Sequence, residues 1–339
     1  MVSRVSTAGS TVQNILNLQR NQENFDLLSY RIATGKNFQE LRDYGTDATR
    51  LVDLRQEISS RDAYVRSITM TEIFLSAYDS SLERMAGITQ DLLDAADPLS
   101  TNDANWGPNN TTLADNMLLE TEANLNLEVG GRFLYSGTNY TTAPVNNLRN
   151  LNLYALTEIG TPDVIETSNQ IPEIVYDSAG PSYQSYHSSF AGTGTLDANA
   201  WQVAQLTISD GQTADYGITA THQAFQNLVD GLMRFKTAAQ PGLTEVERKD
   251  LLAEARTLAN SARDQIRQLQ SSNGVITTVM NNAKSMHVSF IDISITALNG
   301  IEVADTAEAA TRLSILQTQI QASYSTIAKR QQLSLVNFL

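Results

Sequence analysis

The 339-residue chain has no cysteine, and all seven of its prolines lie between Pro98 and Pro241. The absence of cysteine excludes disulfides, thiol nucleophiles and cysteine-bound metals. Because a proline inside a helix costs about 3 kcal/mol, the two proline-free ends are suited to long helices. The proline-containing middle would form a separate, more compact body. Aromatic residues make up only 7% of the chain, which favours elongated packing over one large globular core.

The chain also lacks the features of a membrane or nucleic-acid-binding protein. No run of about 18 apolar residues occurs, so we expect no membrane insertion. The residues after Met1 contain no apolar stretch of the kind found in a cleavable signal peptide. The net charge of −14 is concentrated in residues 98–242, which hold 4 basic and 14 acidic residues. An acidic middle without a basic face argues against a nucleic-acid partner.

Apolar residues recur at alternating spacings of three and four in both proline-free ends, which is the coiled-coil pattern. The first such seam comprises Leu51, Leu54, Ile58, Arg61, Val65, Ile68, Glu72, Leu75, Asp79 and Leu82. A second seam follows the capping box formed by Thr244 and Glu247. It comprises Leu252, Ala255, Ala259, Ala262, Ile266, Leu269, Asn273, Ile276, Met280, Ala283, His287, Phe290, Ser294, Ala297 and Ile301. A helix from Thr244 to Leu298 would be about 80 Å long, and Gly300 is expected to mark a joint.

The middle of the chain lacks the coiled-coil pattern of the two ends. A helix is predicted from about Thr112 to Glu128, and short apolar pieces between Gly, Pro, Asn and Ser clusters predict a β-rich insert over about 132–217. The predicted fold class is therefore mainly α with a β-rich insert. Long antiparallel coiled-coil helices from both termini would form a rod, and a central α+β domain would face outward. The predicted domains are 1–42 (terminal helix), 43–97 (rod helix), 98–242 (central domain), 243–299 (rod helix) and 300–339 (terminal helix).

The sequence contains few groupings of side chains suited to catalysis or cofactor binding. Gly35 and Lys36 lack the upstream glycine of a phosphate-binding loop, and the three histidines are far apart. Asp91, Asp94 and Asp97 lack the glycine of a calcium-binding loop. We therefore predict a protein that is not an enzyme and that has no catalytic residues, cofactor or metal.

Several segments resemble the bacterial flagellin family. Residues Ile301–Tyr324 and the closing Leu333–Leu339 are similar to the C-terminal domain of flagellins, and Ile32–Lys36 resembles the turn that follows their first helix. Gly131–Val145 is similar to a segment of the family members found at the hook–filament junction. In contrast, Asn37–Ala48 departs from the sequence usual in filament flagellins. The resemblance implies a structural subunit that joins hook to filament, with a filament subunit as the alternative.

The resemblance also implies partners and a location. These are copies of the same chain, the neighbouring axial proteins (hook-associated protein and flagellin), the flagellar export apparatus and an export chaperone. The protein would be extracellular, at the hook–filament junction, after type III export without a cleaved signal. A free coiled-coil scaffold or chaperone in the cytoplasm is a further alternative. The terminal helices are expected to pair with each other and to pack between subunits through Val12, Ile15, Leu18, Phe25, Leu28, Ile32, Leu313, Leu316, Ile320, Ile327, Leu333, Leu335, Phe338 and Leu339.

Overall fold

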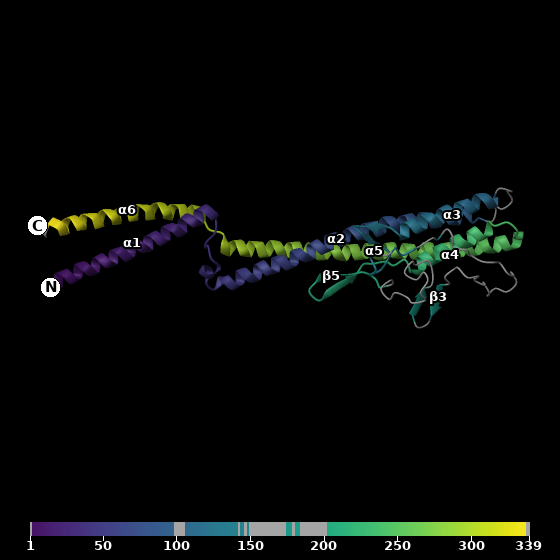
Figure 1. The fold of residues 1–339 in the computed structure, drawn as a ribbon, viewed down its shortest axis with the longest axis horizontal. Helices are drawn as coiled ribbons and strands as arrows, with labels where there is room; N and C mark the ends of the chain where they lie inside the picture. The colour runs from purple at the N-terminus through teal and green to yellow at the C-terminus, as the bar shows by residue number, and fades with distance from the viewer. Residues whose placement is uncertain are drawn as a thin grey trace. The chain divides into compact units, whose positions relative to one another are not determined.

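The computed structural model describes residues 2–97, 106–141, 143–145, 148, 174–177, 180–183 and 202–336. In these ranges the helices are α1 (Val2–Thr34), η1 (a 3-10 turn, Leu41–Tyr44), α2 (Asp47–Ala95), α3 (Trp106–Leu125), α4 (Gln223–Ala238), α5 (Glu245–Glu302) and α6 (Thr306–Val336) (Figure 1). The strands pair as antiparallel hairpins, namely β1 (Glu128–Val129) with β2 (Arg132–Phe133), β3 (Ile174–Asp177) with β4 (Gly180–Tyr183), and β5 (Gln205–Ser209) with β6 (Gln212–Asp215). The predicted mainly helical fold with a small β insert is confirmed.

Two predicted features of the helices need correction. The helix expected from about Thr112 begins at Trp106 and ends at Leu125. Pro108 lies in its first turn, where its missing N–H needs no helical partner. Helix α5 runs through Gly300 and ends at Glu302, so this glycine does not mark the joint. Much of the predicted β-rich insert, including residues 149–173, lies outside the described residues.

The chain divides into two compact units, and the divisions fall within α2 and α5. We call residues Met1–Ala63 with His287–Leu339 the terminal unit, and residues Tyr64–Met286 the central unit. The connection from α1 to α2 and the connection from α5 to α6 both belong to the terminal unit.

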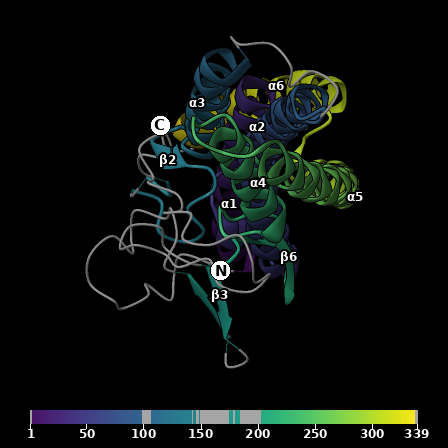
Figure 2. The ribbon, with the colours of Figure 1, turned by 90° about the vertical axis from the view of Figure 1, so that its right-hand side faces the viewer.

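The core of the central unit is built by α2, α3, α4 and α5. Figure 2 shows these helices end-on. On α5 the predicted seam is confirmed by burial from Leu252 to Ala283, where its positions are all buried or half-buried, whereas Phe290, predicted in the same seam, is exposed. On α2 the seam prediction fails at Asp79, which is exposed, whereas Tyr78 is buried. Further along α2, the seam residue Leu82 and its neighbour Ser81, which is not a seam residue, are both buried. The segment that contains Leu134 and Tyr135 also packs on this part of α2, so the buried face is wider than a two-helix seam.

Asn273 is a buried polar residue in the α5 seam. Its Nδ2 donates a hydrogen bond of 3.0 Å to the backbone carbonyl of Leu75 on α2. Nearby, the Lys284 Nζ lies 2.7 Å from a carboxylate oxygen of Glu72. The hydrogen bond satisfies the buried amide of Asn273 in the observed alignment of the two helices.

The segment Gly131–Thr138, part of the resemblance to junction-type family members, anchors the β1–β2 hairpin to the helices. The guanidinium of Arg132 lies 5.0 Å from the ring centre of Phe74, 3.9 Å from that of Tyr140 and 5.6 Å from that of Tyr216. Its Nη1 also donates a 2.7 Å hydrogen bond to the Tyr216 hydroxyl. These cation–π contacts explain why arginine, rather than an apolar residue, occupies this position.

Tyr135 is the buried centre of this anchor. Its ring makes edge-to-face contacts with Tyr78 at 5.2 Å and Phe225 at 5.3 Å between centroids. The Tyr78 hydroxyl donates a hydrogen bond to the backbone carbonyl of Leu134. Burial raises the pKa of both tyrosine hydroxyls, so they stay protonated at neutral pH.

We expect Asp230 on α4 to make the stability of the central unit depend on pH. Burial raises the pKa of its carboxyl from 3.8 to about 6, and the charge of Arg234 offsets part of this increase. The folded state thus binds this proton more tightly than the unfolded chain does. The contribution of Asp230 to the free energy of unfolding should therefore fall as the pH rises from 3.8 to about 6. At pH 7, Asp230→Asn should raise that free energy by about 1–2 kcal/mol.

Urea unfolding of wild type and variant at several pH values between about 4 and 7 measures this contribution. Burial lowers the pKa of His222, which gives the opposite slope, but this contribution cancels when the two proteins are compared. Asp250→Asn, at an exposed position on α5, is the matched control and should leave the pH dependence unchanged. An Asp230→Asn variant with the same pH dependence as wild type would contradict the prediction.

Candidate functional site

In the terminal unit, α1 and α6 lie side by side and antiparallel, so the two ends of the chain lie at the same end of the pair (Figure 1). Gln22 on α1 donates a 2.9 Å hydrogen bond to the hydroxyl of Tyr324 on α6. The apolar contact between the helices is a cluster in which Leu28, Ala309 and Leu316 are buried and Phe25, Leu313 and Ile320 pack against them. These residues recur at spacings of three and four along each helix, so they share one face.

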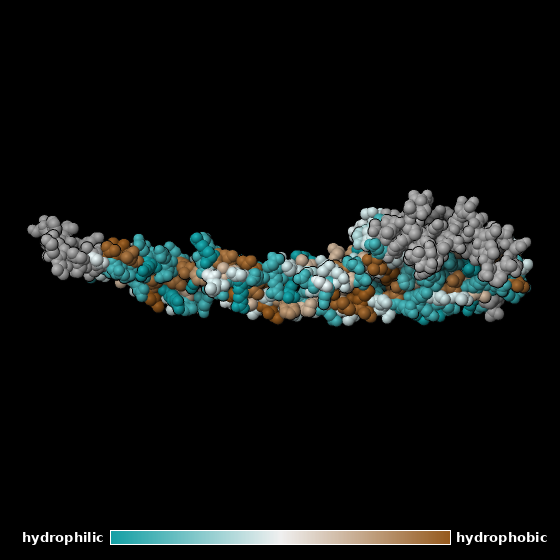
Figure 3. Space-filling model, turned by 90° about the horizontal axis from the view of Figure 1, so that it is seen from below, coloured by the Kyte–Doolittle hydropathy of each residue, from teal (hydrophilic) through white to brown (hydrophobic). Residues whose placement is uncertain are grey.

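Apolar side chains also occupy other faces of these two helices. Val12 and Ile15 on α1 are 57% and 47% exposed, and Ile315 on α6 is 55% exposed. Leu16 and Ile32 are exposed as well. In Figure 3 such apolar side chains interrupt the hydrophilic surface of the terminal helices. A helix with apolar residues on several sides is typically buried on several sides, and one partner helix cannot cover them all.

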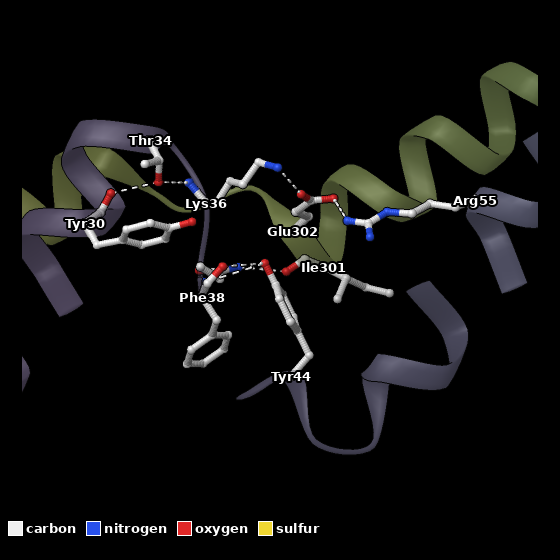
Figure 4. A network of polar contacts seen from close by, with 9 residues as sticks. Tyr30, Thr34, Lys36, Phe38, Tyr44, Arg55, Ile301 and Glu302 are labelled. Carbon is white, nitrogen blue, oxygen red and sulfur yellow. Dashed lines mark hydrogen bonds and ion pairs between the residues drawn. The ribbon is translucent and has the colours of Figure 1, made fainter. Parts of the chain in front are cut away.

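A clasp joins the segment that follows α1 to the end of α5 and the residues after it, and we define the clasp as Gly35–Asn37 together with Ile301–Ala304 (Figure 4). The backbone N–H of Asn37 donates to the carbonyl of Glu302 at 2.8 Å, and that of Ala304 donates to the carbonyl of Gly35 at 2.8 Å. The Asn37 side-chain amide donates to the carbonyls of Ile301 at 2.8 Å and Val303 at 3.1 Å. Gly35 ends α1 with a φ of 69°, the left-handed conformation expected of a C-terminal glycine cap.

The Glu302 carboxylate holds the clasp electrostatically. It lies 2.7 Å from Lys36 Nζ and 2.9 Å from Arg55 Nη2, and its own side chain is only 10% exposed. The hydrogen bond from Lys36, with a further contribution from Arg55, lowers the pKa of Glu302, and the same bond raises the pKa of Lys36. Glu302 is therefore ionised at neutral pH and bridges two cations that come from different parts of the chain.

The predicted packing residues fall into groups. Buried or half-buried side chains are those of Leu18, Phe25, Leu28, Leu313, Leu316, Ile320 and Ile327, while those of Val12, Ile15 and Ile32 are exposed. Leu333 and Leu335 belong to α6, but their side chains are outside the described part of the chain, as are Phe338 and Leu339 altogether. That these residues pack between subunits stays a prediction.

The sequence analysis missed the clasp. Lys36 was noted in an incomplete phosphate-binding pattern and in the turn that resembles the flagellin family, and neither Arg55 nor Glu302 was singled out. More than 240 residues separate Arg55 from Glu302, and no local pattern reveals a partner so far away. The one available signal was the position of Glu302, a charged residue directly after the last apolar residue of the α5 seam.

In the described ranges, no group of three or more histidine, aspartate or glutamate residues could hold a metal ion. Among the helices of the same ranges, none combines the length and hydrophobicity that crossing a bilayer requires.

The structure thus defines a protein of long helices whose N- and C-terminal helices form an antiparallel pair tied by a clasp. Residues 257–339 match the family model for the bacterial flagellin C-terminal helical region. The predicted resemblance to bacterial flagellins is thereby confirmed over these residues, which contain most of α5 and all of α6. No curated protein matches the chain.

Two solved structures are similar in fold. One is assigned as a flagellar hook-associated protein of Vibrio parahaemolyticus, with 13% sequence identity, a TM-score of 0.53, and coverage of 77% of this chain and 100% of that chain. The other is flagellar hook-associated protein 3 of Legionella pneumophila, with 16% identity, a TM-score of 0.36, and coverage of 75% of this chain and 97% of that chain. At these identities the first likeness shows a shared fold, and the second adds nothing to that conclusion.

Proposed function

We propose that this chain is a structural subunit of the bacterial flagellum that joins the hook to the filament. In this proposal it is exported by the flagellar apparatus with the aid of a chaperone. It then assembles outside the cell by coiled-coil packing of α1 and α6 against copies of itself and against neighbouring axial proteins. The observation that carries the proposal is the set of apolar side chains that α1 and α6 expose away from their mutual contact. The flagellin-type C-terminal region and the fold shared with a hook-associated protein support it.

Charges on the exposed apolar face are expected to prevent assembly. In the double variant Val12→Asp, Ile15→Asp, each new carboxylate would enter an apolar subunit contact, and burying an unpaired charge is strongly unfavourable. Both positions point away from α6, so the intramolecular pair should persist. In a flagellated strain that depends on this chain, we expect secretion without incorporation and a loss of motility.

The double variant Gln13→Asp, Asn17→Asp is the matched control, because it adds the same charge at exposed polar positions of the same helix. It should assemble normally. Quantitative mass spectrometry of sheared flagella measures incorporation in each strain. Normal incorporation of the Val12→Asp, Ile15→Asp variant would show that this face is not an assembly surface.

A filament subunit is the second candidate function, and the match to the flagellin C-terminal region favours it as much as a junction role. The copy number of the chain relative to hook protein in purified flagella separates the two. A thin junction layer requires fewer copies than hook protein, whereas a filament requires far more. We expect the lower number.

A further inference from the structure

The helix break between α5 and α6 is not explained by the residues that form it. Helix α5 ends at Glu302 and α6 begins at Thr306, so three residues separate them. Residues 301–309 contain neither proline nor glycine, and Gly300 is itself helical. Alanine and glutamate, good helix formers, make up five of these nine residues. The local sequence would allow a continuous helix.

The clasp occupies the backbone groups that such a helix would use. In a continuous helix, the carbonyls of Ile301, Glu302 and Val303 would each accept from the N–H four residues later. Here all three accept from Asn37 instead, through its backbone N–H and its side-chain amide. The N–H of Ala304, which would donate to Gly300, donates to Gly35. Four helical hydrogen bonds are thus replaced by bonds to residues 35 and 37.

The other side of the break is completed by Asp305. Its Oδ1 accepts hydrogen bonds of 3.0 Å from the backbone N–H groups of Ala307 and Glu308. In a continuous helix these two groups would donate to Val303 and Ala304. Asp305 therefore caps α6 only while the helix is broken, and a capping aspartate is also tolerated inside a helix.

We propose that residues 303–305 form a conditional helix break, held open by the docked segment Gly35–Asn37. While this segment is docked, α5 and α6 are separate. When it is withdrawn, the freed backbone groups pair with each other and the two helices join into one of roughly 90 residues. The same segment ends α1, and Arg31 of α1 donates to the Asn37 carbonyl at 3.0 Å. Docking of α1 onto α6 and breaking of the C-terminal helix are consequently one coupled event.

The sequence offers a selective reporter of the break. The dipeptide Val-Ala occurs twice, at Val203–Ala204 in the central unit and at Val303–Ala304 in the break. Labelling with carbonyl-¹³C valine and ¹⁵N alanine therefore gives two resolvable signals in the intact chain. The Val303 carbonyl shift reports whether the break is helical, and the Val203 signal reports whether the central unit stays folded.

The releasing variant is Lys36→Ala, Asn37→Pro, which removes the ion pair to Glu302 and all three hydrogen bonds that Asn37 donates. We expect the Val303 carbonyl signal to move to the helical position while the Val203 signal stays in place. The matched control, Glu40→Ala, Arg42→Ala, removes an exposed ion pair of the same connection and should move neither signal. The variant Asp305→Ala, with the clasp intact, should leave Val303 non-helical.

Three results would overturn the proposal. A Val303 signal that does not move in the releasing variant would mean that the break is fixed locally. A shift to the random-coil position would mean that the clasp orders this segment without suppressing a helix. A helical shift in Asp305→Ala alone would assign the break to the cap of α6 instead of to the clasp.

Discussion

Replacement of Tyr135 by alanine is expected to lower the free energy of unfolding of the central unit by about 3–5 kcal/mol. Its side chain is fully buried and lies between the rings of Tyr78 and Phe225. Truncation would leave a cavity lined by rigid aromatic groups and would remove both edge-to-face contacts. Urea unfolding followed by tryptophan fluorescence measures the change, because Trp106 is buried in the same unit.

Tyr135→Phe is the matched control, because it keeps both ring contacts and removes only the hydroxyl. It should cost about 1 kcal/mol or less. If the phenylalanine variant lost as much stability as the alanine variant, the hydroxyl and not the ring would be the stabilising group. That result would contradict the packing argument for the Gly131–Thr138 segment.

Gly217→Val is the second substitution with a large expected effect, at about 3 kcal/mol of destabilisation. A Cβ at this position would lie 2.4 Å from the backbone nitrogen of Ala204 and 3.2 Å from its Cα. The carbonyl of Ala204 accepts hydrogen bonds from the N–H groups of both Tyr216 and Gly217. The two backbone segments are thus fixed at a separation that leaves no room for a side chain.

The same substitution at Gly87 is the matched control, since nothing lies within 4 Å of a Cβ built there. Gly87 is an exposed residue of α2, and valine has a slightly higher helix propensity than glycine. Thermal unfolding of the two variants measures the contrast. Equal midpoints would show that the segment containing Ala204 can move to accommodate the side chain.

Periodicity predicted the long helices and the buried face of α5 because the same spacing that makes a helix amphipathic also selects the residues that its neighbours cover. It failed at Asp79 on α2, where the segment containing Leu134 and Tyr135 also packs, and at Phe290 on α5, which is exposed. The helix predicted from about Thr112 begins at Trp106 instead, since the first turn of a helix tolerates Pro108.

The candidate site was harder to predict than the fold. Seven positions on α1 and α6 that are buried or half-buried, such as Leu28 and Leu316, could be found from their spacing alone. The clasp could not, because its bonds join backbone groups of Gly35 and Asn37 to residues more than 260 positions away. Backbone hydrogen bonds between distant segments carry no residue-type signature, so a single sequence does not reveal them.

The hydrogen bond between Asn273 and the Leu75 carbonyl has a mechanical consequence for the central unit. If α5 slid along α2, the amide would lose this acceptor and would be buried without a partner until another backbone carbonyl of α2 came within reach. Sliding is therefore opposed at a single point as well as by the apolar seam as a whole. Under axial load or torsion, the two helices should bend or twist as one body before they shear past each other.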